Sequence, residues 1–190
     1  SAAKVVVVGA GPAGLEAAMS LGRRGYEVVL AEATTTLGGR VAREARLPGL
    51  AAWVRVADYR IGQLERLATV EIARGSVVTA EEALGYGFDH IAVATGATWR
   101  RDGVGRATLR PLPLGDGVEL LTPDDLLSGG RPAGERVVVY DDDHFYLGGV
   151  LAELLAREGR AVRLVTPSSR ASAWTDNTME QHRIQARRLD

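Results

Sequence analysis

The chain has 190 residues, of which 46% are hydrophobic and 25% are charged. A chain of this size buries roughly 70% of the surface that its unfolded form exposes, so we expect a globular protein of one large or two small domains. Its 23 basic and 24 acidic residues give a formal net charge of -1, which provides no basic field for nucleic acid or anionic lipid. We therefore expect neither nucleic acid nor a membrane as a partner.

The sequence contains no cysteine, so the chain itself forms no disulfide, no thiolate nucleophile and no cysteine-ligated iron–sulfur cluster. The apolar run near the start, residues 5–8, is far shorter than a signal-peptide core or a membrane span. We therefore expect a cytoplasmic location, with any iron–sulfur chemistry outside this chain.

A β-branched run that ends in a glycine-rich turn opens the sequence. In chain order we expect a buried strand at residues 5–8, the turn at 9–14, a helix at 15–24 and a strand at 27–31. Gly25 directly follows the expected helix, and glycine is favoured just past a helix end. This order of strand, turn, helix and strand predicts a βαβ unit, and hence an α/β fold with a parallel sheet.

Four further elements are expected before residue 97. Apolar residues at helical spacing predict an amphipathic helix over 50–68, and a short strand follows at 70–73. Thr79 and Glu82 have the spacing of a capping box that opens a brief helix. The segment 90–94 is predicted to be a buried strand.

The stretch rich in proline and glycine between residues 97 and 135 predicts a crossover between two domains, with one short helix capped by Thr122. A second unit follows, with strands at 136–140 and 161–165, a helix at 146–158 and a last helix from about 178 to 189. We therefore divide the chain into a first domain at 1–100, a crossover at 101–135 and the start of a second domain at 136–190.

The glycine-rich turn has the spacing of a dinucleotide-binding motif. In that motif Gly9 permits the tight turn, Gly11 lets a pyrophosphate approach the backbone, and Gly14 lets helix and strand pack closely. Pro12 and Ala13 would lie in the first helical turn, whose free N–H groups and positive dipole end favour phosphate. The alternative interpretation is a tight turn with a structural role alone.

Glu32 lies 23 residues after Gly9, at the end of the second strand. A carboxylate there accepts hydrogen bonds from both ribose hydroxyls of an adenosine, and it would repel the 2′-phosphate of NADP. The alternative is an acid that is simply exposed at a strand end.

Further segments resemble one family. Leu37–Arg40 resembles the glycine pair that follows the ribose acid in FAD proteins of the glutathione-reductase type, and Ala94–Ala97 resembles the turn by which the chain leaves their flavin domain. Four other segments together resemble the C-terminal nucleotide-binding region of the trimethylamine, dimethylamine and histamine dehydrogenase family. These segments are 47–50, Trp53, 58–60 and 141–146. The resemblance implies a truncated Rossmann-like FAD/NAD(P)-binding fold of the glutathione-reductase type.

The resemblance also implies a larger parent enzyme, an old-yellow-enzyme-like NADH:flavin oxidoreductase. Its N-terminal barrel would carry FMN and a 4Fe-4S cluster, and electrons would pass to an electron-transfer flavoprotein; the parent is expected to be a homo-oligomer. This chain would hold no catalytic residue and would bind ADP or FAD, with Gly39 and Arg40 near the pyrophosphate and Thr95 and Gly96 lining the site. Arg40 is equally compatible with a solvated surface cation.

Two departures from the pattern of FAD- and NAD(P)-binding relatives bear on function. Where a second glycine motif should bind NAD(P)H, the chain has Asp141, Asp142 and Asp143, whose charges repel a pyrophosphate. We expect these acids to cap the next helix or face water, and we prefer this to a metal site with His144. The closing Gly-Asp strand that completes the flavin site of FAD relatives is also absent.

Two rival functions stay open at this point. One is the FAD domain of an NAD(P)H-dependent flavin oxidoreductase such as a dienoyl-CoA reductase. The other is a non-redox nucleotide-sensing module. His90, His182 and the three tryptophans receive structural interpretations, because no partner for acid–base or nucleophilic chemistry lies near them in sequence.

Overall fold

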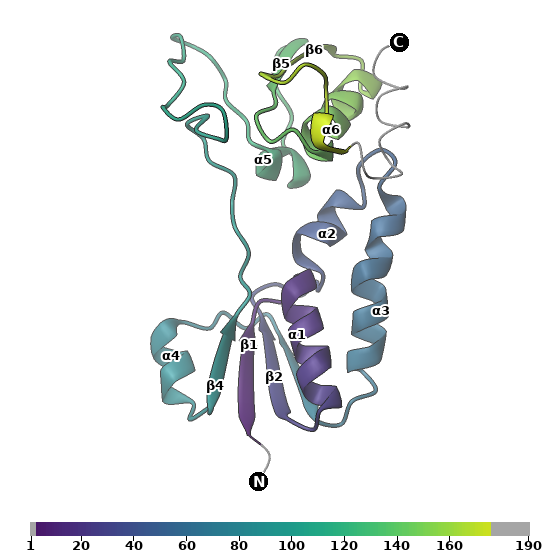
Figure 1. Ribbon diagram of the computed structural model, residues 1–190, viewed down its shortest axis with the longest axis vertical. Coiled ribbons are helices and arrows are strands. Elements are labelled where there is room, and N and C mark those ends of the chain that lie inside the picture. Colours follow the sequence, from purple (N-terminus) through teal and green to yellow (C-terminus); the bar gives the residue numbers. More distant parts are fainter. Residues whose placement is uncertain (1–2, 176–190) are drawn as a thin grey trace. The chain divides into compact units, whose positions relative to one another are not determined.

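The computed structural model describes residues 3–175 and confirms the predicted α/β fold with parallel strands (Figure 1). The chain forms two compact units. The first comprises Ser1–Arg46 and Leu50–Ala97, and the second comprises Leu47–Gly49 and Thr98–Asp190. Within residues 3–175, no helix has both the length and the apolar composition needed to cross a bilayer.

The first unit is built on a four-stranded parallel sheet in the order β3-β2-β1-β4. Its strands are β1 (Lys4–Val8), β2 (Glu27–Glu32), β3 (Val70–Arg74) and β4 (His90–Val93). Valine dominates the centre of the sheet because β-branched side chains suit a pleated surface that is covered on both faces. Since all strands run in one direction, their carboxyl ends share one edge of the sheet.

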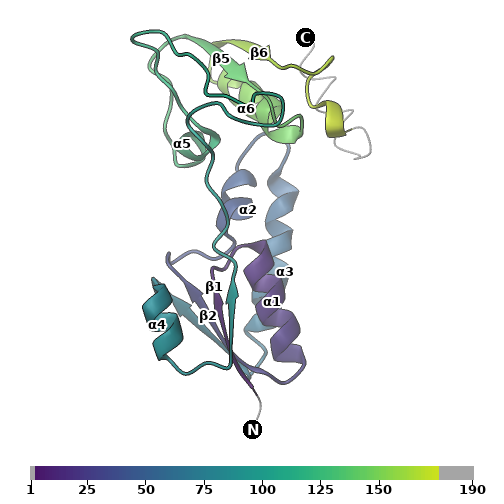
Figure 2. The same cartoon turned by 60° about the vertical axis from the view of Figure 1, so that its left-hand side comes forward.

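Four α-helices accompany this sheet: α1 (Pro12–Arg23), α2 (Gly39–Glu44), α3 (Val54–Leu64) and α4 (Ala80–Gly85), with a 3-10 turn η1 (Ala51–Trp53) before α3. Figure 2 shows α1 and α3 on one side of the sheet and α4 on the other. The core lies between α1, α3 and the sheet, where Leu15, Leu30 and Leu64 are almost fully buried. The capping box of α4 is present, since the Thr79 N–H donates to Glu82 Oε2 at 2.8 Å.

The predicted burial of the strand at 90–94 is wrong. Val93 is 74% exposed and Ile91 is 38% exposed. The reason is the strand's position, because β4 lies at the end of the sheet and pairs only with β1 within the described residues. An apolar run is typical of a central strand, but the sequence does not reveal which strand lies at the edge.

The second unit contains a parallel pair, β5 (Arg136–Tyr140) and β6 (Ala161–Val165), connected by α6 (Tyr146–Arg157). The short helix α5 (Pro123–Leu127) precedes them, and the 3-10 turn η2 (Ala173–Thr175) follows. Both predicted strands are confirmed, and α6 ends one residue earlier than predicted, before Gly159 at a φ of 86°. The helix predicted from about residue 178 lies outside the described residues, and the domain limits at 100 and 135 stay predictions.

Substituting Gly14 by alanine tests how tightly β1 and α1 are joined. A Cβ at Gly14 would lie 1.8 Å from the carbonyl oxygen of Gly9, which is backbone and cannot move aside. We expect Gly14→Ala to lower the free energy of unfolding by about 2–4 kcal/mol, measured by urea denaturation. Gly62→Ala is the matched control, because an added Cβ there meets no atom within 4 Å in the interior of α3. This control should stabilise the protein by up to about 1 kcal/mol, and equal effects of the two substitutions would contradict the packing argument.

Candidate functional site

The glycine turn between β1 and α1 lies at the carboxyl edge of the first sheet. Gly9 has a φ of +99°, and a Cβ there would lie 2.4 Å from the Ala94 carbonyl oxygen. Gly9 and Gly14 must therefore be glycine, because a Cβ at either position would collide with other backbone atoms of the protein. Gly11 differs from both, since an added Cβ would meet nothing within 4 Å. The backbone at Gly11 therefore faces open space, and a ligand can approach it.

The start of α1 presents backbone donors beside this opening. Within residues 3–175, the N–H groups of Gly11, Ala13 and Gly14 donate to no acceptor of the protein. Such groups carry the positive end of the helix dipole. Ala10, by contrast, donates its N–H to the Glu32 carboxylate at 2.8 Å. The turn therefore offers three donors and brings the strand-end acid next to them.

The Glu32 carboxylate is held in place by three donors. Oε2 accepts from Ala10, and Oε1 accepts from the N–H and the hydroxyl of Thr34, both at 2.9 Å. Burial by itself would raise the pKa of the Glu32 carboxyl, but the hydrogen bonds from Thr34 and Ala10 outweigh it, so the pKa lies below the ordinary value. At neutral pH Glu32 is therefore ionised and oriented beside the glycine turn.

The second glycine pair brings α2 against the turn. Gly38 has a φ of +103° and donates its N–H to the Ala10 carbonyl oxygen at 2.8 Å. Gly39 has a φ of +52°, and a Cβ there would lie 3.0 Å from Gly11 Cα. The pair is therefore needed so that two backbone segments can meet at the rim of the opening.

Arg40 connects α2 with the segment after β4. Its Nη2 donates to the Ala97 carbonyl oxygen at 2.7 Å. In the same segment, Thr95 Cα would lie 3.1 Å from a Cβ at Gly9, and Gly96 has a φ of +77°. The segment thus passes beside the glycine turn, with the Arg40 guanidinium tied to it.

The first unit thus gathers every residue that the sequence indicated for the site. Those residues are Gly9, Gly11, Pro12, Ala13, Gly14, Glu32, Gly39, Arg40, Thr95 and Gly96. Sequence reasoning missed Thr34, which orients the carboxylate, and it identified Gly38 only as part of the glycine pair, without its contact to Ala10. A threonine two residues after a strand-end acid is a recognisable local hydrogen-bonding pattern and could have been noticed. The contact between Arg40 and Ala97 spans 57 residues and leaves no comparable signal.

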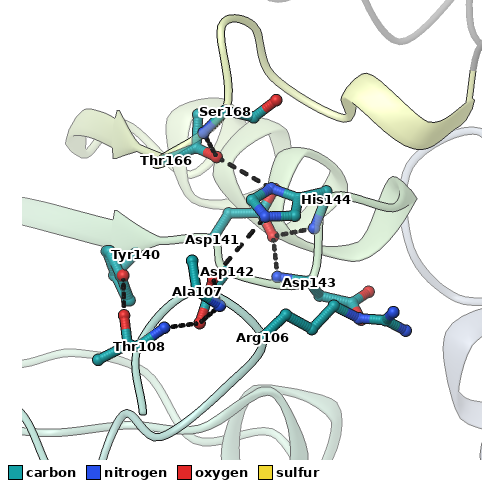
Figure 3. Close-up of polar contacts among 10 residues, drawn as sticks. All are labelled: Arg106, Ala107, Thr108, Tyr140, Asp141, Asp142, Asp143, His144, Thr166 and Ser168. Atoms are coloured by element: carbon teal, nitrogen blue, oxygen red, sulfur yellow. Dashed lines mark hydrogen bonds and ion pairs between the residues drawn. The ribbon is translucent and has the colours of Figure 1, made fainter. Parts of the chain in front are cut away.

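The corresponding turn of the second unit is closed by its own carboxylates (Figure 3). Asp141 is 3% exposed, and its Oδ1 accepts from the N–H groups of Asp143 and His144, both at 3.2 Å. Asp142 accepts from the N–H of Ala107 at 2.9 Å and from that of Thr108 at 3.1 Å. The expectation that these acids cap the helix or face water is therefore wrong for Asp141 and Asp142. They instead satisfy backbone donors of the turn and of a neighbouring loop.

Asp141 also lies against the first turn of α6. A Cβ at Gly148 would lie 2.6 Å from Asp141 Cγ, so glycine leaves the room that this carboxylate fills. In dinucleotide folds a phosphate lies at this position, in front of the helix that follows the first strand. In the part of the chain that the structure describes, no three histidine or acidic side chains are grouped to hold a metal ion.

Comparison with known proteins decides the family. The model for pyridine nucleotide-disulphide oxidoreductases matches residues 3–186. The chain belongs to this family. Histamine dehydrogenase from Rhizobium sp. 4-9 has a structure that is similar over 100% of this chain and 30% of its own, with 54% identity and a TM-score of 0.95.

Two further relatives agree with this assignment. Dimethylamine dehydrogenase from Hyphomicrobium sp. (strain x) is 38% identical over 188 residues, which make up 95% of this chain and 25% of that protein. The structure of 6-hydroxypseudooxynicotine amine oxidase from Pseudomonas geniculata N1 is similar over 96% of this chain and 27% of its own, at 48% identity and a TM-score of 0.92. The predicted resemblance to the amine dehydrogenases is thus confirmed. The chain spans between a quarter and a third of the length of these oxidoreductases.

The two turns of this pyridine nucleotide-disulphide oxidoreductase chain therefore differ in what they can accept. The turn at Gly11 has open space, free donors and an oriented carboxylate, so it fits the adenosine diphosphate portion of a dinucleotide. The turn at Asp141 has a buried carboxylate in the corresponding place. An incoming phosphate there would meet both a steric barrier and a like charge.

Replacing Asp143 by asparagine tests the electrostatics of the second turn. Burial, and secondly the charge of Asp141, raise the pKa of the Asp143 carboxyl. Because the folded state then disfavours the ionised form, Asp143 reduces stability at neutral pH, and this penalty disappears as the pH falls through the raised pKa toward 3.8. We expect Asp143→Asn to raise Tm by about 1–3 °C at pH 7, with a smaller difference at pH 4.

The exposed Asp116 provides the control, since Asp116→Asn should leave Tm unchanged at both pH values. A lower Tm for Asp143→Asn at pH 7 would show that the ion pair with Arg106, at 4.0 Å, outweighs the burial penalty.

Proposed function

We propose that this chain is the adenine-nucleotide-binding part of a flavin- and iron–sulfur-dependent oxidoreductase, and that its first unit binds ADP or the ADP portion of FAD. The observation that carries the proposal is the open backbone at Gly11, enclosed by glycines that are required on steric grounds. No catalytic residue is assigned within the chain, whose role is to bind and orient the nucleotide.

The diphosphate would be held by backbone groups. The free N–H groups of Gly11, Ala13 and Gly14 can each donate to a phosphate oxygen, and Pro12 loses nothing there because its position needs no donor. Arg40 reaches the same rim through Gly39, and its positive charge complements the two phosphates.

The ribose would be held by Glu32. Of the roughly four acceptor sites of its carboxylate, three take the bonds from Ala10 and Thr34, so one is left for a ribose hydroxyl. A second ribose hydroxyl would take the place of the Thr34 hydroxyl, which also reaches the Thr36 carbonyl oxygen at 2.9 Å. A negative charge at this position disfavours a 2′-phosphate, so the proposal specifies an unphosphorylated ribose. Thr95 and Gly96 would line the site where the ligand continues past the diphosphate. ADP and FAD share every group discussed here, and FAD would additionally supply a redox-active ring.

The parent protein is proposed to be a cytoplasmic amine dehydrogenase. In support, the chain is 54% identical to histamine dehydrogenase and 38% identical to dimethylamine dehydrogenase over nearly its whole length. An N-terminal barrel would hold FMN and a 4Fe-4S cluster, which agrees with the absence of cysteine from this chain. We further propose that the parent protein passes its electrons to an electron-transfer flavoprotein. The parent is also proposed to be a homo-oligomer.

A second candidate is the FAD domain of an NAD(P)H-dependent flavin oxidoreductase. The family that the chain matches is named after pyridine nucleotides, which favours this candidate. The buried carboxylate of Asp141 against Gly148 argues against it, since that carboxylate takes the place of the required phosphate.

Calorimetric titration of the purified chain with ADP tests the primary proposal. We expect binding that Glu32→Ala weakens by about 1–3 kcal/mol, or roughly 5- to 150-fold, because a charged hydrogen-bond acceptor is lost. Glu27→Ala is the matched control, since Glu27 begins the strand that Glu32 ends, and it should leave the affinity unchanged. Unaltered affinity in Glu32→Ala would exclude the ribose role and favour a nucleotide-sensing module with another mode of binding. Mass spectrometry of the molecule released on denaturation would separate ADP from FAD.

NADH added to the chain after saturation with ADP tests the second candidate. Saturation is needed because NADH itself contains an ADP portion. We expect no further heat of binding, because Asp141 fills the phosphate position of the second unit. Binding that persists under saturating ADP would instead support the NAD(P)H-dependent enzyme.

A further inference from the structure

The hydroxyl of Thr34 has two acceptors but only one hydrogen to donate. Its Oγ1 lies 2.9 Å from Glu32 Oε1 and also 2.9 Å from the Thr36 carbonyl oxygen. A threonine hydroxyl donates one hydrogen, and it rotates to suit the acceptor. Of the two acceptors here, the charged carboxylate is the stronger. The Thr36 carbonyl oxygen is therefore a second partner that lies ready at the same distance.

The loop that carries Thr34 does not depend on this hydroxyl. Three donors from residues 74–76, directly after β3, bond the carbonyl oxygens of Glu32, Thr34 and Thr35, at 2.8, 3.0 and 3.3 Å. The backbone N–H of Thr34 also donates to Glu32 Oε1 at 2.9 Å. The hydroxyl can therefore change its acceptor while the loop and the carboxylate keep their places.

The two oxygens of the Glu32 carboxylate face a ribose differently. Within residues 3–175, Oε2 accepts a hydrogen bond from Ala10 alone, so it has an acceptor position open. Oε1 accepts from both the N–H and the hydroxyl of Thr34, so a ribose hydroxyl reaches it only in place of the Thr34 hydroxyl. The two hydroxyls of a ribose are adjacent, and one of them can donate to each oxygen.

We propose that Thr34 is a positioning residue whose hydroxyl occupies the place of one ribose hydroxyl until a nucleotide binds. The ribose hydroxyl then donates to Glu32 Oε1, and the Thr34 hydroxyl donates to the Thr36 carbonyl oxygen instead. Every donor keeps an acceptor in this exchange, so little free energy is lost. The inference rests on the proposed function, because it concerns the same carboxylate.

The exchange specifies a further class of ligand. When a nucleotide lacks the hydroxyl that would reach Oε1, the Thr34 hydroxyl stays there, and no acceptor is left unpaired. When it lacks the hydroxyl that would reach Oε2, no side chain takes its place in the described part of the chain. The site should therefore accept one of the two deoxyribose forms of ADP and reject the other.

Calorimetric titration of the purified chain with ADP, 2′-deoxy-ADP and 3′-deoxy-ADP tests this selectivity. We expect one deoxy form to bind within about 3-fold of ADP and the other to bind at least ~10-fold more weakly, because an acceptor beside it loses its donor. Two deoxy forms that both bind at least ~10-fold more weakly than ADP, or both as tightly as ADP, would overturn the proposal.

Thr34→Val separates the exchange from a purely structural role. Valine has the shape of threonine and keeps the backbone N–H, but it has no hydroxyl to displace. We expect the affinity for ADP to stay the same or to rise by up to about 3-fold, and the tolerated deoxy form to become roughly 5- to 50-fold weaker than ADP. A hydroxyl that only orients Glu32 predicts weaker binding of ADP instead. Such a loss, or an unchanged ratio of the two affinities, would refute the exchange.

Two control variants belong to the same loop. Thr34→Ser retains the hydroxyl and should keep the selectivity of the unaltered chain. Thr36→Val keeps the accepting carbonyl group, and within residues 3–175 the Thr36 side chain makes no hydrogen bond, so all three affinities should stay unchanged. A change of selectivity in Thr36→Val as large as that in Thr34→Val would contradict the assignment to Thr34.

The outcomes distinguish this inference from the proposed function. Absence of ADP binding to the unaltered chain would count against both. Binding of ADP that Glu32→Ala weakens, together with a selectivity that Thr34→Val leaves unchanged, would uphold the nucleotide site and reject the exchange at Thr34 alone.

Discussion

The close approach of α1 to the end of β1 is the constraint on which the first unit depends. There is no room for even one carbon atom between Gly14 and the Gly9 carbonyl oxygen. This contact fixes the direction in which α1 leaves the sheet, and with it the direction of the unpaired N–H groups at its start. Gly39 then brings α2 to the same place, and the Ala10 N–H ties the Glu32 carboxylate to the turn. A binding site made mostly of backbone therefore follows from steric requirements.

The two βαβ units of the chain show opposite uses of one geometry. Each places a turn between a strand and the start of a 12-residue helix, where an anion is favoured. At Gly11 the space is open, and an anion must come from outside. At Asp141 the anion is a side chain of the protein, so the turn is stable without a ligand. One unit is thus suited to bind a nucleotide and the other to hold its own structure.

The sequence alone predicts the order of the helices and strands and the glycine turn between β1 and α1, because both depend on local patterns. Glycine spacing, β-branched runs and the capping box at Thr79 each act within a few residues. Other features depend on distant segments. The exposure of Val93 follows from the place of β4 in the sheet, and the contacts of Asp142 follow from backbone N–H groups of Ala107 and Thr108, more than thirty residues away. Because no partner of Asp142 lies near it in the sequence, the sequence alone predicts that it caps the next helix or faces water.

The edge position of β4 has a consequence for handling the protein. Among residues 3–175, β4 pairs on one side only and carries a 74% exposed valine, and such an edge offers a template on which another strand can add. An edge of this kind is where copies of a chain can add to one another strand by strand, which is the first step of edge-to-edge growth. Placing a lysine at the exposed Val93 would oppose such growth, since a charge on an edge strand is how natural sheets prevent it.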